Sequence, residues 1–209
     1  MTYALLVKKF ERLGGTFVTR ETLMLLCGEL GMGYIPAVGY LTSNRYIVRI
    51  MRGIFYVKGI EERKLDTLKL NHLEAIREAM TLKGVGNWYF GLETAASLGN
   101  LAHEYFTITS VISDSIGRSR PFEIMGHKVR FIKVSRNLFG FGVISANVPH
   151  SDPEKTLLDM VYLGRYNGLS EAEISGNAAD LLKHCSWDKL HDYGGKYPKT
   201  VMKFLERMR

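Results

Sequence analysis

The sequence predicts an α+β protein in which an N-terminal winged helix-turn-helix precedes a mixed α/β domain. Helix signals followed by a hairpin signal within residues 1–60 predict the first part, and segments of helix and strand character after residue 87 predict the second. Hydrophobic residues make up 46% of the 209-residue chain and charged residues 23%, which allows a packed core. We therefore expect a winged helix over 1–60, a linking helix within 61–86 and an α/β domain over 87–209.

Three helices are predicted before the hairpin, over residues 3–13, 20–30 and 36–44. Apolar residues recur with helical spacing in the first two, and glycines follow each of them. Thr19 is a suitable N-cap for the second helix, because its hydroxyl can accept a hydrogen bond from a free backbone N–H. Pro36 suits the first turn of the third helix, where its missing N–H is not needed.

A β-hairpin is predicted within residues 45–59, which read RYIVRIMRGIFYVKG. Segments 46–50 and 54–58 are rich in β-branched and aromatic residues, and Gly53 between them supplies the positive φ of a tight turn. Four cations lie in this stretch, and one of them, Arg52, is at the tip. A hairpin that only covered a core would not need positive charge there.

The charge is concentrated near the N-terminus. The whole chain has a net charge of +7, and residues 1–60 carry eight Lys and Arg against three acids. A basic segment in a chain whose other residues carry nearly equal numbers of positive and negative charges is typical of a module that binds a polyanion. A basic surface that serves only solubility is the alternative.

In a winged helix-turn-helix, the third helix enters the DNA major groove and the wing lies along the phosphate backbone. The residues expected to contact bases are Tyr40, Ser43, Asn44 and Arg45. The residues expected to contact phosphates are Arg20, Arg49, Arg52 and Lys58. Winged helices also bind proteins, so an interaction module remains an alternative to DNA binding.

The rest of the chain mixes helices and strands. Further helices are predicted over 65–80, 88–98 and 198–209, and strands over 105–112, 122–125, 128–134 and 141–146. Another helix begins at Asp152, which is a good N-cap, with Pro153 in the first helical position. The last helix carries three cations at four-residue spacing, which form either a second DNA contact or a solvated face. These cations are Lys199, Lys203 and Arg207.

Three segments together resemble the AbiEi antitoxin family of abortive-infection regulators. AVGYLTSNRYIVRIMRGIFYV (37–57) resembles the wing, and NWYFGLETAASLG (87–99) the first helix of the family's second domain. SDPEKTLLDMVYLG (151–164) resembles its "pEkTllD" segment. The matching residues are Pro153, Glu154, Lys155, Thr156 and Asp159.

The resemblance implies an N-terminal winged helix, a C-terminal α/β domain and repression of the protein's own operon. It also implies the antitoxin half of a type IV toxin–antitoxin pair, whose toxin is a nucleotidyltransferase-like protein. In such systems the antitoxin need not bind the toxin tightly, and some relatives stand alone. We therefore expect a DNA-binding repressor with no cofactor. A repressor that responds to a small-molecule ligand is the alternative function.

We do not expect an enzyme or a metal site. A restriction-type nuclease would need an acid-x-Lys triplet, whereas Glu154 and Lys155 are adjacent and begin a helix. Lys155 and Asp159 instead form an i,i+4 pair. The spacing of His184, Cys185 and His191 matches no common zinc pattern.

We expect a cytoplasmic protein. The two cysteines are far apart and form no CxxC pair, which fits a reducing compartment. No apolar run approaches the roughly 20 residues of a membrane-spanning helix, and the N-terminus lacks the features of a signal peptide. The operator sequence and the oligomeric state are left open.

Overall fold

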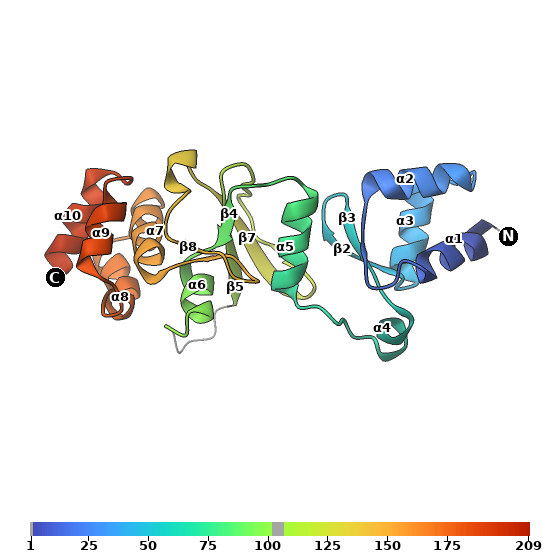
Figure 1. Cartoon of the computed structure of the whole chain (residues 1–209), viewed down its shortest axis with the longest axis horizontal. Coiled ribbons are helices and arrows are strands. Elements are labelled where there is room, and N and C mark those ends of the chain that lie inside the picture. The colour runs from blue at the N-terminus through green and yellow to red at the C-terminus, as the bar shows by residue number, and fades with distance from the viewer. Residues whose placement is uncertain (1, 102–106) are drawn as a thin grey trace. The chain divides into compact units, whose positions relative to one another are not determined.

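The computed structural model describes residues 2–101 and 107–209, and it confirms the α+β class (Figure 1). It contains a three-stranded sheet of order β1-β3-β2 and a six-stranded sheet of order β6-β7-β5-β4-β9-β8. The chain divides into two compact units, 1–86 with 124–126 and 87–123 with 127–209. Among the described residues, no single helix is both long and apolar enough to cross a membrane.

The first unit packs helices against a small antiparallel sheet. Its elements are α1 (Thr2–Glu11), β1 (Phe17–Thr19), α2 (Arg20–Glu29), α3 (Tyr34–Ser43), β2 (Ile47–Met51), β3 (Ile54–Val57), α4 (Ile60–Leu65) and α5 (His72–Leu82). Strand β3 lies between β1 and β2 and pairs antiparallel with both. Helices α1, α2 and α3 bury apolar side chains against it, including Phe10, Leu23 and Leu41, and Phe55 of β3 lies in the same core.

Local sequence signals place several of these boundaries correctly. Thr19 is the N-cap of α2, and its hydroxyl accepts a hydrogen bond from the Thr22 N–H. The hairpin turns at Gly53, whose φ is 78°. Strand β1 has no counterpart in the sequence prediction, because a three-residue strand has too short a pattern to be distinguished from a loop.

The predicted linking helix over 65–80 is wrong. Two helices, α4 and α5, occupy this region and pack within the first unit. Asp66 ends α4 in the left-handed conformation, with φ of 49°. Asn71 then caps α5, and Glu74 completes the capping box by accepting from the Asn71 N–H.

Glu62 connects α4 to the sheet. This buried carboxylate accepts hydrogen bonds from the Tyr56 hydroxyl (2.9 Å) and from the backbone N–H groups of Gly59 and Lys69 (both 2.7 Å). Burial by itself raises the pKa of Glu62, but the donated hydrogen bonds favour the ionised form and leave the pKa below its ordinary value of 4.5.

We expect the first unit to lose stability as the pH falls below 4.5, because the folded-state pKa of Glu62 lies below its unfolded value. The stabilisation is fully present above the unfolded value and is lost as the pH falls through the folded one. Amide hydrogen exchange over residues 54–69 measures this effect. Glu62→Gln should cost about 1–3 kcal/mol at neutral pH and flatten the acid dependence. The exposed control Glu29→Gln should retain that dependence, and equal profiles for the two variants would contradict this role.

The second unit packs a mixed sheet against a long buried helix. Its strands are β4 (Trp88–Phe90), β5 (Ile108–Ser113), β6 (Phe122–Ile124), β7 (His127–Lys133), β8 (Val143–Ile144) and β9 (His150–Ser151). Its α-helices are α6 (Leu92–Leu98), α7 (Pro153–Tyr166), α8 (Glu171–Leu182), α9 (Trp187–Gly194) and α10 (Lys199–Met208), and a 3-10 turn covers Arg136–Leu138. Helix α7 lies between the sheet and the C-terminal helices (Figure 1).

The predicted helix over 88–98 is wrong in its first part. Residues 88–90 form β4, which pairs antiparallel with β5 and parallel with β9, and the helix begins only at Leu92. Three consecutive aromatic residues favour a strand once partners are available on both sides. The strand predicted over 105–112 is found as β5, and residues 105–106 lie outside the described part of the chain.

Helix α7 carries a fully buried ion pair in its N-terminal half. The Lys155 Nζ lies 3.8 Å from the Asp159 carboxylate and donates to the Leu138 carbonyl (2.7 Å) and the Tyr197 hydroxyl (3.2 Å). The hydroxyls of Tyr89 and Tyr197 donate to Asp159 at 2.7 Å and 2.6 Å. We call Tyr89, Lys155, Asp159 and Tyr197 the buried network.

Burial dominates the protonation of the buried network. It raises the pKa of Asp159 and lowers the pKa of Lys155, because a low-dielectric interior penalises either charge, and the attraction between the two groups opposes both shifts. Burial, followed by the nearby Asp159 charge, raises the pKa of Tyr89 and Tyr197, so both remain hydrogen-bond donors. The polar groups of these four residues therefore have their hydrogen-bond partners only when all four are present.

The acids at the start of α7 also have structural partners. Asp152 is the N-cap, as predicted, accepting from the Lys155 N–H at 2.9 Å, and it also accepts from the Tyr193 hydroxyl at 3.1 Å. Glu154 accepts from the Ser186 N–H at 2.9 Å. These contacts hold α7 against α9 and its N-cap.

Candidate nucleic-acid interface

Three cations from separate elements of the first unit gather at the tip of the β2–β3 hairpin. Arg52 is exposed in the turn itself. The Arg20 backbone N–H, at the start of α2, donates to the Gly53 carbonyl at 2.7 Å. The Lys83 Nζ, at the end of α5, donates to the Arg52 carbonyl at 3.1 Å. We call Arg20, Arg52 and Lys83 the basic cluster.

The basic cluster lies beside the N-terminal end of α3. The Arg20 guanidinium carbon is 5.6 Å from the centre of the Tyr34 ring, in the first turn of that helix. One acid is close: the pKa of Glu21 is lowered by a backbone hydrogen bond and the Thr19 hydroxyl, and further by the charges of Arg20 and Lys83. The cluster therefore keeps a net positive charge.

Arg49 lies on β2, between the tip and the base of the hairpin. Its side chain is exposed, and its guanidinium carbon lies 5.5 Å from the centre of the Phe55 ring on the paired strand. The ring restricts the arginine without neutralising it. Arg49 and Arg52 are therefore both available to an anion.

The other two predicted hairpin cations lie at its base and are paired. Asp66 accepts from Arg45 at 2.8 Å and from Lys58 at 3.1 Å, and these two cations lower its pKa. Lys58 is only 8% exposed. Lys58 was expected to face phosphates; instead it is buried beside Asp66, because the chain after the hairpin folds back over it.

The predicted base contacts are largely engaged within the protein. Tyr40 packs between the rings of Tyr3 and Tyr46, with centroid distances of 4.3 and 6.4 Å. The Asn44 side-chain amide donates to the Tyr40 carbonyl at 2.9 Å, at the end of its own helix. Ser43 stays exposed at the same end of the helix.

The outward face of α3 is uncharged. It carries Ile35, Pro36, Gly39, Thr42 and Ser43, all exposed. Ile35, which follows Tyr34 in the first turn of the helix, is 80% exposed. Sequence reasoning missed both Lys83, which lies far along the chain, and Ile35, because an isolated exposed isoleucine has no pattern of its own.

The predicted second basic patch on α10 is partly neutralised. Arg207 donates to Glu171 at 2.8 Å, while Lys199 and Lys203 are exposed. Within residues 2–101 and 107–209, no group of three or more His, Cys, Asp or Glu side chains is arranged to hold a metal ion.

No family model matches this chain, and no curated protein matches it. Its fold is similar to the crystal structure of the RV2827C protein from Mycobacterium tuberculosis, with a TM-score of 0.61 over 99% of this chain and 75% of that one. Because the sequence identity is 16%, this likeness shows a common fold alone.

Proposed function

We propose that the first unit binds double-stranded DNA as a winged helix-turn-helix and that the protein is a sequence-specific transcriptional repressor in the cytoplasm. The basic cluster carries this proposal. Three cations from three parts of the first unit converge on the tip of the β2–β3 hairpin. This tip lies beside the first turn of α3, and one face of α3 is exposed to solvent. Such a tip meets phosphates when the helix lies in the major groove.

In this pose, base recognition shifts toward the N-terminal half of α3. Recognition helices read base edges with their N-terminal residues, and that end of α3 lies beside the basic cluster. The exposed Ile35 side chain suits contact with the methyl group of thymine. Thr42 and Ser43 are placed for contacts further along the groove.

The expected result is a preference of at least about tenfold, or 1.4 kcal/mol, for DNA from upstream of the protein's own gene over a scrambled duplex. Fluorescence anisotropy across a salt titration measures it, because specific contacts persist where phosphate contacts weaken. Ile35→Ala should reduce the ratio of the affinity for the upstream duplex to the affinity for the scrambled duplex. Leu25→Ala, which removes a similarly exposed apolar side chain from α2, should not. Equal and salt-sensitive binding to both duplexes would contradict sequence-specific recognition. It would indicate a basic surface that attracts any DNA.

We further propose that the repressor is the antitoxin of a type IV pair, with a nucleotidyltransferase-like toxin as its functional partner. The three segments that resemble the AbiEi family support this step. Co-expression with a neighbouring gene of that class tests it: the toxin alone should arrest growth, and this protein should restore growth. If growth stays arrested, the antitoxin role is excluded while the DNA-binding proposal is unaffected.

A ligand-responsive repressor is the second candidate function. The observation that favours it is a cavity of about 680 Å³ in the second unit, which is within the size range of small-molecule sites. A ligand of this cavity should then change the DNA affinity as well as the melting temperature of the second unit.

A further inference from the structure

Residues 115–136 of the second unit are strongly basic. They contain six Lys and Arg against one acid, Glu123. Three of these cations are exposed and come together at the carboxyl end of β7. We call these three residues, Arg118, Lys133 and Arg136, the β7 cluster.

The loop between β5 and β6 brings Arg118 to β7. The Arg118 backbone N–H donates to the Phe131 carbonyl at 3.0 Å. Gly117 lies so close to the strand that a Cβ added to it would be 2.8 Å from the Lys133 Cβ. Arg136 follows three residues after Lys133, in the 3-10 turn. The β7 cluster therefore combines cations from two separate segments at one end of the strand.

The β7 cluster is not neutralised within the described part of the chain. The Arg118 guanidinium carbon lies 4.2 Å from the centre of the Phe122 ring, which stacks on Phe131. None of the three cations has an ion pair with a described carboxylate. Asp114, directly after β5, is an acid at the same end of the sheet, and it accepts from the Asn87 side chain at 2.8 Å. The cluster therefore keeps a net positive charge.

A cavity of about 300 Å³ opens beside the β7 cluster. Lys133 lines it together with two tyrosines of α7, Tyr162 and Tyr166. Tyr162 packs against the Tyr197 ring, with the ring centroids 5.9 Å apart, whereas Tyr166 is 79% exposed. The Tyr166 ring is therefore available to a ligand that also contacts the cations.

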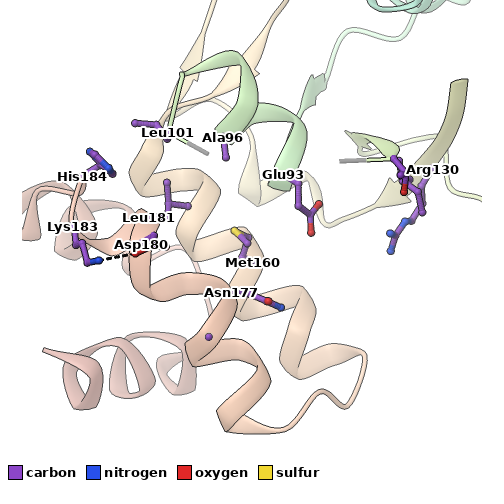
Figure 2. A pocket seen from close by; sticks show the side chains of 13 residues that line it. Glu93, Ala96, Leu101, Arg130, Met160, Asn177, Asp180, Leu181, Lys183 and His184 are labelled. Atoms are coloured by element: carbon purple, nitrogen blue, oxygen red, sulfur yellow. Dashed lines mark hydrogen bonds and ion pairs between the residues drawn. The ribbon is translucent and has the colours of Figure 1, made fainter. Parts of the chain in front are cut away.

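The larger cavity of the second unit has no such ring. It lies between α6 and α8 (Figure 2), and no Phe, Tyr or Trp is among the described residues that line it. Its exposed lysine, Lys183, forms an ion pair with Asp180. The smaller cavity, by contrast, combines an unpaired lysine with an exposed aromatic ring.

We propose that the second unit binds a single-stranded polynucleotide, with its phosphates on the β7 cluster and a base stacked on Tyr166. Proteins that bind single strands combine cations along the phosphate backbone with aromatic rings on which bases stack. The bases of a duplex are already paired and stacked on one another, so a duplex cannot use the tyrosine. RNA and single-stranded DNA share this chemistry. The site is formed by the second unit alone and does not depend on DNA binding by the first.

The test measures the fluorescence anisotropy of labelled oligothymidylate and oligouridylate, each of about 15 nucleotides. It uses the full-length protein carrying Arg20→Ala/Arg52→Ala/Lys83→Ala, which removes the basic cluster of the first unit. Saturable binding is expected, and the oligonucleotide that binds more tightly identifies the class of strand. A random-sequence duplex of the same length should bind at least about tenfold more weakly, because it offers no base to Tyr166.

Further substitutions in the same background separate stacking from charge. Tyr166→Ala should raise the Kd by about fivefold or more, whereas Tyr166→Phe should leave it within about twofold, because phenylalanine keeps the ring. Lys133→Ala should flatten the slope of log K against log salt by about 0.7, the change expected for one phosphate of a single strand. Lys128→Ala is the matched control, because it removes an exposed cation from the other end of β7, about 17 Å away, and it should leave the slope unchanged.

The proposal is overturned by equal Kd values for Tyr166→Ala and Tyr166→Phe, by equal salt slopes for Lys133→Ala and Lys128→Ala, or by the absence of saturable binding. Equal affinity for the duplex would overturn the assignment of a single strand. Because the basic cluster of the first unit is already removed, none of these outcomes bears on its binding to operator DNA.

Discussion

Replacing Asp159 by alanine is expected to lower the free energy of unfolding of the second unit by about 3–5 kcal/mol. The substitution leaves the Lys155 ammonium buried without its counter-charge. It also leaves the hydroxyls of Tyr89 and Tyr197 without their acceptor. Because whole domains are stable by only about 5–15 kcal/mol, the loss is a large fraction of the total. Both tryptophans of the chain, Trp88 and Trp187, lie in this unit, so tryptophan fluorescence during urea unfolding reports on it selectively.

The matched control is Glu171→Ala, which removes an exposed carboxylate that also has two cationic partners, Arg165 and Arg207. Its cost should stay within about 1 kcal/mol, since solvent screens such pairs. The double variant Lys155→Met/Asp159→Leu should lose less stability than Asp159→Ala, because it removes both buried charges together. A double variant as unstable as the single one would show that the phenol hydrogen bonds, rather than the unpaired charge, dominate the network.

The triple variant Arg20→Ala/Arg52→Ala/Lys83→Ala is expected to weaken DNA binding by about a hundredfold or more at about 0.1 M salt. If each cation of the basic cluster neutralises one phosphate, the slope of log K against log salt should flatten by about 2.7. The loss should be similar on the upstream and the scrambled duplex, because phosphate contacts carry no sequence information. Fluorescence anisotropy at several salt concentrations measures both quantities.

A triple variant with the same loss of charge separates the basic cluster from net charge. Lys8, Arg12 and Lys64 are exposed cations on α1, after it and on α4. Replacing all three by alanine should flatten the slope of log K against log salt by less than about 0.9, the change expected for one phosphate contact. Equal losses from the two triple variants would contradict a localised phosphate site and would indicate attraction by the overall charge of the unit.

Signals that act over a few residues were sufficient to predict much of the fold. A hydroxyl at Thr19, a carboxylate at Asp152 and the glycine at Gly53 each act on backbone groups within a turn of themselves, so their effect does not depend on the rest of the chain. Apolar periodicity likewise predicted α1 and α2 in the first unit and α7 in the second. The sequence therefore determined the α+β class, most of the helices and the hairpin with Arg52 at its tip.

Long-range contacts decided what local signals could not. Residues 88–90 became a strand because β5 and β9 lie on either side of them, although the sequence around them is helical in character. Lys58 is buried instead of facing phosphates because Asp66, at the end of α4, returns to it, and Arg45 forms an exposed ion pair with the same carboxylate. No propensity or spacing within one segment contains this information.

The candidate DNA-binding site also depends on long-range contacts that local sequence signals do not contain. The Lys83 ammonium reaches the Arg52 carbonyl across 31 positions of the chain. A charged or polar side chain acquires its function from the groups that surround it, and those groups are set by packing rather than by neighbours in sequence. The sequence by itself determined which elements form and which of their residues are charged; only the tertiary structure decided which charges remain available to a ligand, because pairing and burial depend on contacts between distant segments.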